Sequence, residues 1–151
     1  MDENTSTRQD RARGAAIVEM ALVSVVLLTL VFGIITYAYM MSFQQSITQA
    51  AAEGARAGAV APPSIDSTLA QSLADAAARQ AVAGFARDCS SGAMSCTAQI
   101  IPCPIDASRE CVRVRITYDY DRDPLLPAFP GLGLVLPNQL VAEAIAEVTE
   151  V

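Results

Sequence analysis

The sequence contains no histidine, no lysine and no tryptophan, and all ten of its basic residues are arginine. Without histidine, the chain has no His-based acid–base pair, no Ser-His or Cys-His nucleophile and lacks the commonest metal ligand. Without lysine, it cannot form a Schiff base with a carbonyl substrate. These absences argue against an enzyme, so we expect no catalytic residue, no cofactor and no small-molecule substrate.

Charge and proline are missing from long stretches of the N-terminal part. Residues Met20 to Phe43 form an apolar run of 24 residues without a charged side chain, and no proline occurs before Pro62. About 20 apolar residues suffice to cross a hydrocarbon core of about 30 Å. Because proline breaks helices, its absence predicts one transmembrane helix that continues beyond the membrane to about Ala59.

The distribution of charge predicts the orientation of this helix. Arg8, Arg11 and Arg13 lie just before the apolar run, which places the N-terminus in the cytoplasm and the rest of the chain outside. Residues 1–13 are polar and lack apolar periodicity, so we expect no regular structure there. Beyond Phe43 the chain has seven arginines and twelve acidic residues, a net charge of −5 that argues against a nucleic-acid partner.

A short motif joins the basic flank to the apolar run. It reads Arg-Gly-Ala-Ala-Ile-Val-Glu from Arg13 to Glu19. A carboxylate at the edge of a membrane span is unfavourable unless it reaches the interface or finds a partner, so Glu19 is a candidate functional residue.

Gly14, with Glu19 as the fifth residue after it, resembles the class III signal of type IV pilins and pseudopilins, in which a membrane peptidase cuts after the glycine. The motif is most similar to TadE-like pseudopilins of tight-adherence (Tad) pilus systems, which usually have phenylalanine where Met20 stands. The resemblance implies that a prepilin peptidase removes residues 1–14 and creates a free amine at Ala15. It also implies that Glu19 neutralises that amine on a neighbouring subunit during assembly.

The same resemblance implies a place and partners for the protein. It predicts a structural component of pilus assembly in the bacterial inner membrane, with its C-terminal domain in the periplasm. Its partners would be other pilins, pseudopilins and Tad assembly proteins. A minor subunit is favoured, because major Tad pilins are far shorter. The alternative is an unprocessed single-pass membrane protein whose outer domain binds partners of the secretion machinery.

After the membrane run, the chain becomes rich in alanine and glycine. Ala50, Gly54 and Gly58 recur every four residues and form a smooth stripe where another backbone can approach closely. We favour packing against the chain's own next helix over packing on a neighbouring subunit. Pro62 and Pro63 end the first helix, Ser64 or Asp66 can cap the next one, and residues 65–87 have the spacing of a second, amphipathic helix.

The remaining residues indicate strands. Residues 97–101 and 111–120 are strand candidates, and the second alternates apolar and polar side chains. For residues 139–151 we favour a strand over a helix, with Arg113 and Arg115 facing Glu143 and Glu147. Residues 125–137 form an apolar loop that should lie on the core, the membrane or a partner.

The sequence therefore predicts an α+β protein in three parts: a leader (1–14), a transmembrane and emergent helix (15–60), and a periplasmic head (61–151) with a small antiparallel sheet.

All four cysteines lie between Cys89 and Cys111, which predicts two disulfides in an exported segment. We favour Cys89 with Cys96 and Cys103 with Cys111, because Pro102 and Pro104 stiffen the chain around Cys103. The nested pairing, Cys89 with Cys111 and Cys96 with Cys103, remains open. Intervals of seven, seven and eight residues do not match a zinc knuckle, so we expect no metal there.

Asp119, Asp121 and Asp123 are interpreted as turn acids rather than calcium ligands, since the glycine and later glutamate of calcium loops are missing.

Overall fold

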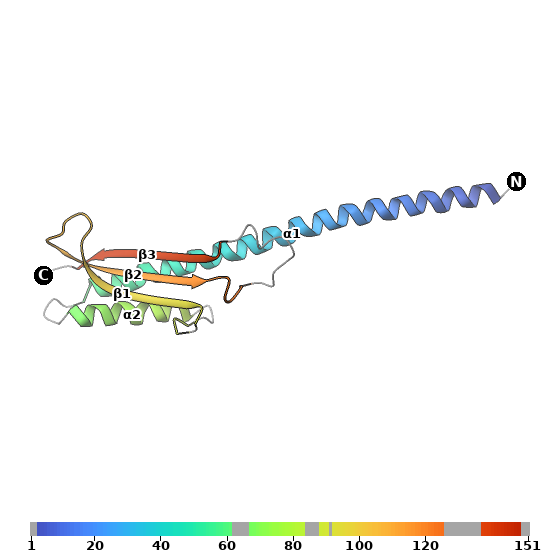
Figure 1. Cartoon of the computed structure of the whole chain (residues 1–151). Helices are drawn as coiled ribbons and strands as arrows, with labels where there is room; N and C mark the ends of the chain where they lie inside the picture. Colours follow the sequence, from blue (N-terminus) through green and yellow to red (C-terminus); the bar gives the residue numbers. More distant parts are fainter. Residues whose placement is uncertain (1–2, 62–66, 84–87, 91, 126–136, 149–151) are drawn as a thin grey trace. The chain divides into compact units, whose positions relative to one another are not determined.

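The computed structural model describes residues 3–61, 67–83, 88–90, 92–125 and 137–148. Two helices precede three strands, as Figure 1 shows: α1 (Glu3–Ala59), α2 (Ser67–Ala83), β1 (Met94–Pro102), β2 (Glu110–Asp119) and β3 (Gln139–Glu147). This is the predicted α+β fold. The predicted caps Ser64 and Asp66, the end of the second helix near Arg87 and most of the apolar loop lie outside the described residues.

The chain divides into two compact units, one ending at Tyr39 and the other beginning at Met40. Helix α1 contributes to both. In the first unit, α1 is the only described element. The second unit, which we call the head, contains the last part of α1 together with α2 and the sheet.

Helix α1 begins earlier than the sequence suggested. It starts at Glu3, so the expectation that residues 1–13 lack regular structure is wrong for residues 3–13. No proline interrupts this stretch, and a glycine inside a helix costs only about 0.5–1 kcal/mol relative to alanine. The helix therefore passes through Gly14 and ends at Ala59, where the sequence predicted its end.

The small-residue face of α1 packs inside the head. A Cβ atom added to Gly54 would lie 2.9 Å from both the Ala74 carbonyl oxygen and the Ala78 Cβ. At Gly58 it would lie 2.9 Å from a Val112 methyl group. The stripe thus contacts the chain's own α2 and β2, which confirms the interpretation that we favoured.

The three strands form an antiparallel sheet in the order β1-β2-β3. Val112, Val114, Ile116 and Tyr118 of β2 are fully buried, which confirms the predicted apolar face of this strand. The Phe43 ring of α1 meets the Tyr118 ring edge-on, with centroids 4.9 Å apart. One face of the sheet therefore packs on helices, while the charged side chains lie on the other.

Strand pairing explains where the observed strands differ from the prediction. Residues 139–147 form β3, which confirms the strand that we favoured for this segment. Strand β1 starts at Met94 rather than at Thr97, because Met94 and Cys96 pair with Tyr118 and Ile116 of β2. That pairing depends on the partner strand and leaves little trace in the local sequence.

We predict that Gly54→Ala destabilises the head. The new methyl group would press on a backbone oxygen of α2, and such overpacking costs about 1–3 kcal/mol, more than the roughly 0.5–1 kcal/mol that alanine gains in a helix. Denaturant unfolding of the detergent-solubilised protein, followed by tyrosine fluorescence, measures the effect. Ala52→Leu on the exposed side of α1 is the matched control and should leave the free energy of unfolding almost unchanged. Equal stability of Gly54→Ala and the wild type would contradict the close packing.

Candidate functional site

The motif at the start of the apolar run lies on a fully accessible stretch of α1. Gly14, Ala15 and Glu19 are all exposed. Apart from its two chain neighbours and the nearby backbone of the same helix, a Cβ atom added to Gly14 would meet no atom within 4 Å. The Gly14–Ala15 peptide bond therefore has open space around it, although it lies in a helix that would have to unwind locally before a protease could bind it.

Glu19 lies one helical turn after Ala15. Residues four apart on a helix share one face, so the Glu19 side chain projects from the same side of α1 as Ala15. Among the described side chains, Glu19 has no ion-pair partner. An acid at the edge of an apolar segment is unfavourable without a counter-charge, so Glu19 remains a candidate for pairing with a cation.

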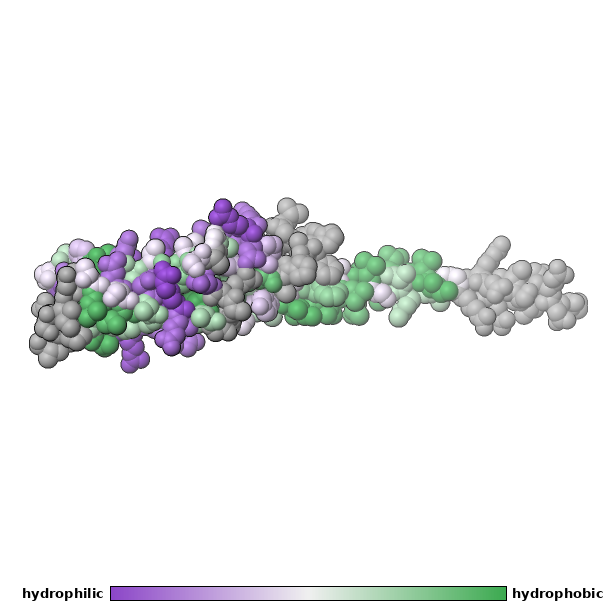
Figure 2. Space-filling model, turned by 90° about the horizontal axis from the view of Figure 1, so that it is seen from below, coloured by the Kyte–Doolittle hydropathy of each residue, from purple (hydrophilic) through white to green (hydrophobic). Residues whose placement is uncertain are grey.

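The side chains that follow are apolar and exposed. Ile17 is 69% exposed and Leu22 is 66% exposed, and the apolar surface continues along α1 as the green stretch in Figure 2. Within the described residues, one helix is long and apolar enough to cross a membrane. Exposed apolar surface of this extent is unfavourable in water, and it fits the single-pass membrane helix that the sequence predicted.

Two hydroxyl groups in this stretch are already satisfied by the helix itself. Ser24 Oγ donates to the Met20 carbonyl at 2.7 Å, and Thr29 Oγ1 donates to the Val25 carbonyl at 2.8 Å. Such bonds to the preceding turn give each hydroxyl hydrogen an acceptor where no water is available. Among the described side chains from Gly14 to Leu30, Glu19 is thus the polar one that has no hydrogen-bond or ion-pair partner.

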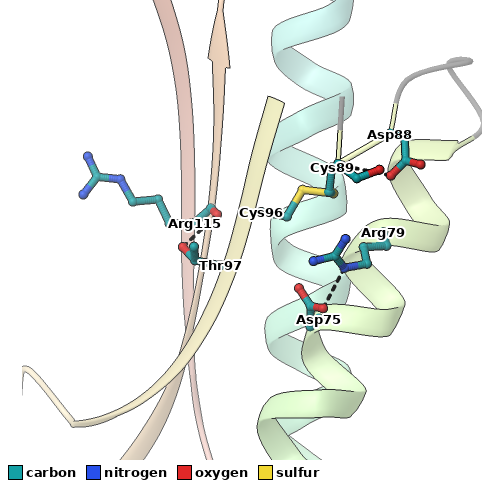
Figure 3. Close-up of a disulfide and its surroundings, with 8 residues drawn as sticks. Asp75, Arg79, Asp88, Cys89, Cys96, Thr97 and Arg115 are labelled. Atoms are coloured by element: carbon teal, nitrogen blue, oxygen red, sulfur yellow. Dashed lines mark hydrogen bonds and ion pairs between the residues drawn. A yellow bond between two sulfur atoms is a disulfide. The ribbon is translucent and has the colours of Figure 1, made fainter. Parts of the chain in front are cut away.

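Two disulfides stabilise the loops of the head. Cys89 bonds to Cys96 with their Cα atoms 5.4 Å apart, which ties the segment after α2 to β1 (Figure 3). Cys103 bonds to Cys111 with their Cα atoms 5.0 Å apart and closes the β1–β2 hairpin. The favoured pairing is confirmed, and the nested pairing is wrong.

Two aspartates near these disulfides accept hydrogen bonds that stabilise turns. The Asp88 carboxylate accepts the Ser90 backbone N–H at 3.0 Å, and this bond lowers the pKa of Asp88. Asp106 accepts the Ser108 hydroxyl at 2.6 Å, which lowers the pKa of Asp106 in the same way. Both aspartates hold turns at or within the disulfide loops, so their ionised forms support loop geometry rather than chemistry.

Ion pairs line the open face of the sheet. Glu143 lies 3.4 Å from Arg113 Nε and 4.0 Å from Arg115 Nε, as the alternating pattern predicted. Glu147, however, pairs with Arg109 instead of with either predicted arginine. Arg109 comes from the hairpin before β2, and sequence alternation alone could not place it there. Such half-exposed ion pairs each contribute at most about 1 kcal/mol to the free energy of unfolding.

Two glutamines that the sequence did not single out bind the edges of the sheet. Gln71 of α2 donates to the Ala98 carbonyl of β1 at 2.7 Å, and Gln44 of α1 donates to the Val141 carbonyl of β3 at 3.0 Å. A glutamine on an exposed helix face normally indicates only solvation. No local pattern could have revealed either contact.

The acidic turn after β2 shows no metal-binding arrangement. The Asp119 carboxylate accepts the Arg122 backbone N–H at 3.2 Å, as expected of a turn acid. Across the described part of the chain, no group of three or more His, Cys, Asp or Glu side chains could hold a metal ion.

Comparison with known proteins identifies the N-terminal segment. Residues 14–56 match the family of TadE-like proteins, which confirms the resemblance seen in the motif. The match begins at Gly14, includes the whole apolar run and ends before α2. No curated protein and no solved structure matches the chain significantly.

Proposed function

We propose that this chain, with its TadE-like segment from Gly14 onward, is a pseudopilin or minor pilin of a Tad-type pilus. It is a structural subunit that is anchored by α1 and presents its head outside the inner membrane. The observation that carries the proposal is the boundary of the family match. It starts at the glycine after which cleavage would occur, and it continues over an apolar helix whose side chains are exposed.

Maturation would be a hydrolysis of the Gly14–Ala15 peptide bond by a separate prepilin peptidase. Water adds to the Gly14 carbonyl carbon, the C–N bond breaks, and the products are a leader ending in a carboxylate and a chain that begins with the Ala15 ammonium. The open space around Gly14 supports this step, and so does glycine's low cost of leaving helical geometry.

Cleavage would provide a counter-charge for Glu19, which has none among the described side chains. At the edge of the bilayer the effective dielectric constant is far lower than in water, so an ammonium and a carboxylate attract each other more strongly. In the assembled pilus the ammonium of one subunit would meet Glu19 of the next. Removing either partner would leave a charge unpaired in an apolar setting, which is strongly unfavourable.

A second candidate function follows from the α1 residues before Gly14. Because α1 is continuous from Glu3, the same chain could remain uncut as a single-pass membrane protein whose head binds secretion-machinery proteins. The two functions differ in the length of the mature chain. We favour the pilin-like role, because the segment before Gly14 lies outside the family match.

We predict that Gly14→Leu blocks maturation, because a bulky side chain would occupy the space next to the scissile bond. Gly14→Ala, which adds only one methyl group, should be cut more slowly than the wild type but faster than the leucine variant. Electrophoresis of membrane fractions resolves precursor and mature chains, and alkaline extraction verifies that each variant is inserted. A normal mature band from Gly14→Leu would rule out cleavage at this site.

We predict that Glu19→Ala leaves insertion intact while impairing assembly at least tenfold. The substitution removes an acid from the apolar edge, which favours the bilayer, but it also removes the counter-charge of the new amine. Sheared filaments are collected, and the amount of this chain in them is compared with the amount in membranes. Ser24→Ala, which deletes a locally bonded hydroxyl of the same helix, is the matched control and should assemble normally. Unchanged incorporation of Glu19→Ala would refute the pairing.

A further inference from the structure

Each outer strand of the sheet accepts one glutamine hydrogen bond on its backbone, from Gln44 at Val141 of β3 and from Gln71 at Ala98 of β1, but the two strands differ in charge. Within the described residues β1 and β3 each pair with β2 on one side only. An edge strand exposes backbone N–H and C=O groups, which can pair with a strand of another molecule. Proteins commonly prevent this with charged side chains, bulges or a covering group.

Strand β3 carries charged side chains, and β1 does not. Glu143 and Glu147 lie on β3, so two β3 strands paired about Ile145 would bring these acids opposite each other, and like charges across a sheet are destabilising. Strand β1 has the sequence Met-Ser-Cys-Thr-Ala-Gln-Ile-Ile-Pro, without a charged residue and with its single proline at the end. No charged side chain on β1 would therefore oppose pairing of its edge with another uncharged strand.

The Gln71 side chain covers the middle of this open edge. The Ala98 carbonyl points away from β2, and Gln71 Nε2 donates to it at 2.7 Å. By the alternation of an antiparallel ladder, the N–H and C=O groups of Cys96, Ala98 and Ile100 all face this side. Gln71 occupies the hydrogen-bonding position that a fourth strand would take at Ala98.

A groove lies beside this edge of β1. It holds about 440 Å³ and lies between α2 and β1, with Gln71, Ser72 and Asp75 on one wall and residues 96–99 on the other. Figure 3 shows Cys96 on the α2 side of β1 and Thr97 on the opposite side. A chain entering this groove would meet the backbone edge of β1 directly.

We propose that the outer edge of β1 is a pairing surface for the β1 strand of a second copy, and that the Gln71 side chain keeps this surface closed. Around a two-fold axis at Ala98, Thr97 of one copy would lie opposite Gln99 of the other, and Cys96 opposite Ile100, so no like charges meet. With Gln71 in place, the head does not add strands at this edge. The proposal concerns the head alone and is independent of the pilin-like role.

The experiment compares the full-length chain in detergent micelles with its Gln71→Ala variant. Gln71 is exposed and alanine favours helices, so the substitution should leave α2 folded. Light scattering corrected for detergent gives the protein mass per particle, and hydrogen exchange gives the protection of individual amides. We expect the mass of Gln71→Ala to be at least twice that of the wild type. We also expect its Cys96, Ala98 and Ile100 amides to exchange at least tenfold more slowly.

Two further variants separate the hydrogen bond from other effects. Ser72→Ala alters the same groove wall without removing a contact to β1, because Ser72 bonds to Leu69 within α2. It should behave as the wild type. Gln71→Lys keeps a donor for the Ala98 carbonyl and adds a charge to the edge, so it should also remain like the wild type.

Association through α1 would raise the mass of every variant equally. Amide exchange therefore distinguishes such association from pairing at the β1 edge. Unchanged mass and exchange in Gln71→Ala would overturn the proposal. A larger mass without slower exchange at the three edge amides would overturn it as well. So would slow exchange of these amides in the wild type that disappears on dilution, because the edge would then already be paired.

Discussion

The head depends on the close approach of α1 to α2 and β2 at Gly54 and Gly58. At both positions a single additional carbon would stand about 3 Å from atoms of the neighbouring elements. Interiors are packed at the density of organic crystals, so such a seam tolerates no extra volume. It brings Val112 and Val114 of β2 against the helix and thereby fixes the face of the sheet that is buried. The disulfides and the edge contacts are built on this arrangement.

One helix therefore works in two environments. Its first part exposes large apolar side chains and has the composition of a membrane span. Its last part has a face of glycine and alanine that is buried in the head. The change in residue type explains the change in role. Bulky branched residues suit lipid contact, and glycine and alanine allow backbones to approach each other.

Much of this could be predicted from the sequence, because the signals are local. The apolar run, the alternation in β2 and the two short cysteine intervals are each read from neighbouring residues. The corresponding long apolar helix, strand and disulfides are present. The features that escaped prediction depend on the partner in space. Glu147 forms an ion pair with Arg109, which the hairpin turn places beside it. Gln71 donates a hydrogen bond to Ala98 across the groove between α2 and β1.

The prediction for residues 3–13 was wrong for a different reason. The polar composition of these residues indicated an irregular segment, but without proline and with only one glycine at its end, the chain continues the helix back to Glu3. Helix propagation from an existing helix needs no new nucleus, so even a polar segment can extend it. Composition alone is thus a weak guide next to a long helix.

The mass of the mature protein is the most direct test of cleavage between Gly14 and Ala15. The chain is extracted from the membranes of the cells that produce it and its intact mass is measured, with its N-terminal residue determined by sequencing. A pilin-like subunit should begin at Ala15 and have the mass of residues 15–151 with both disulfides formed. If the protein still carries residues before Gly14 in cells with an active prepilin peptidase, the proposed cleavage and the pilin-like role are wrong.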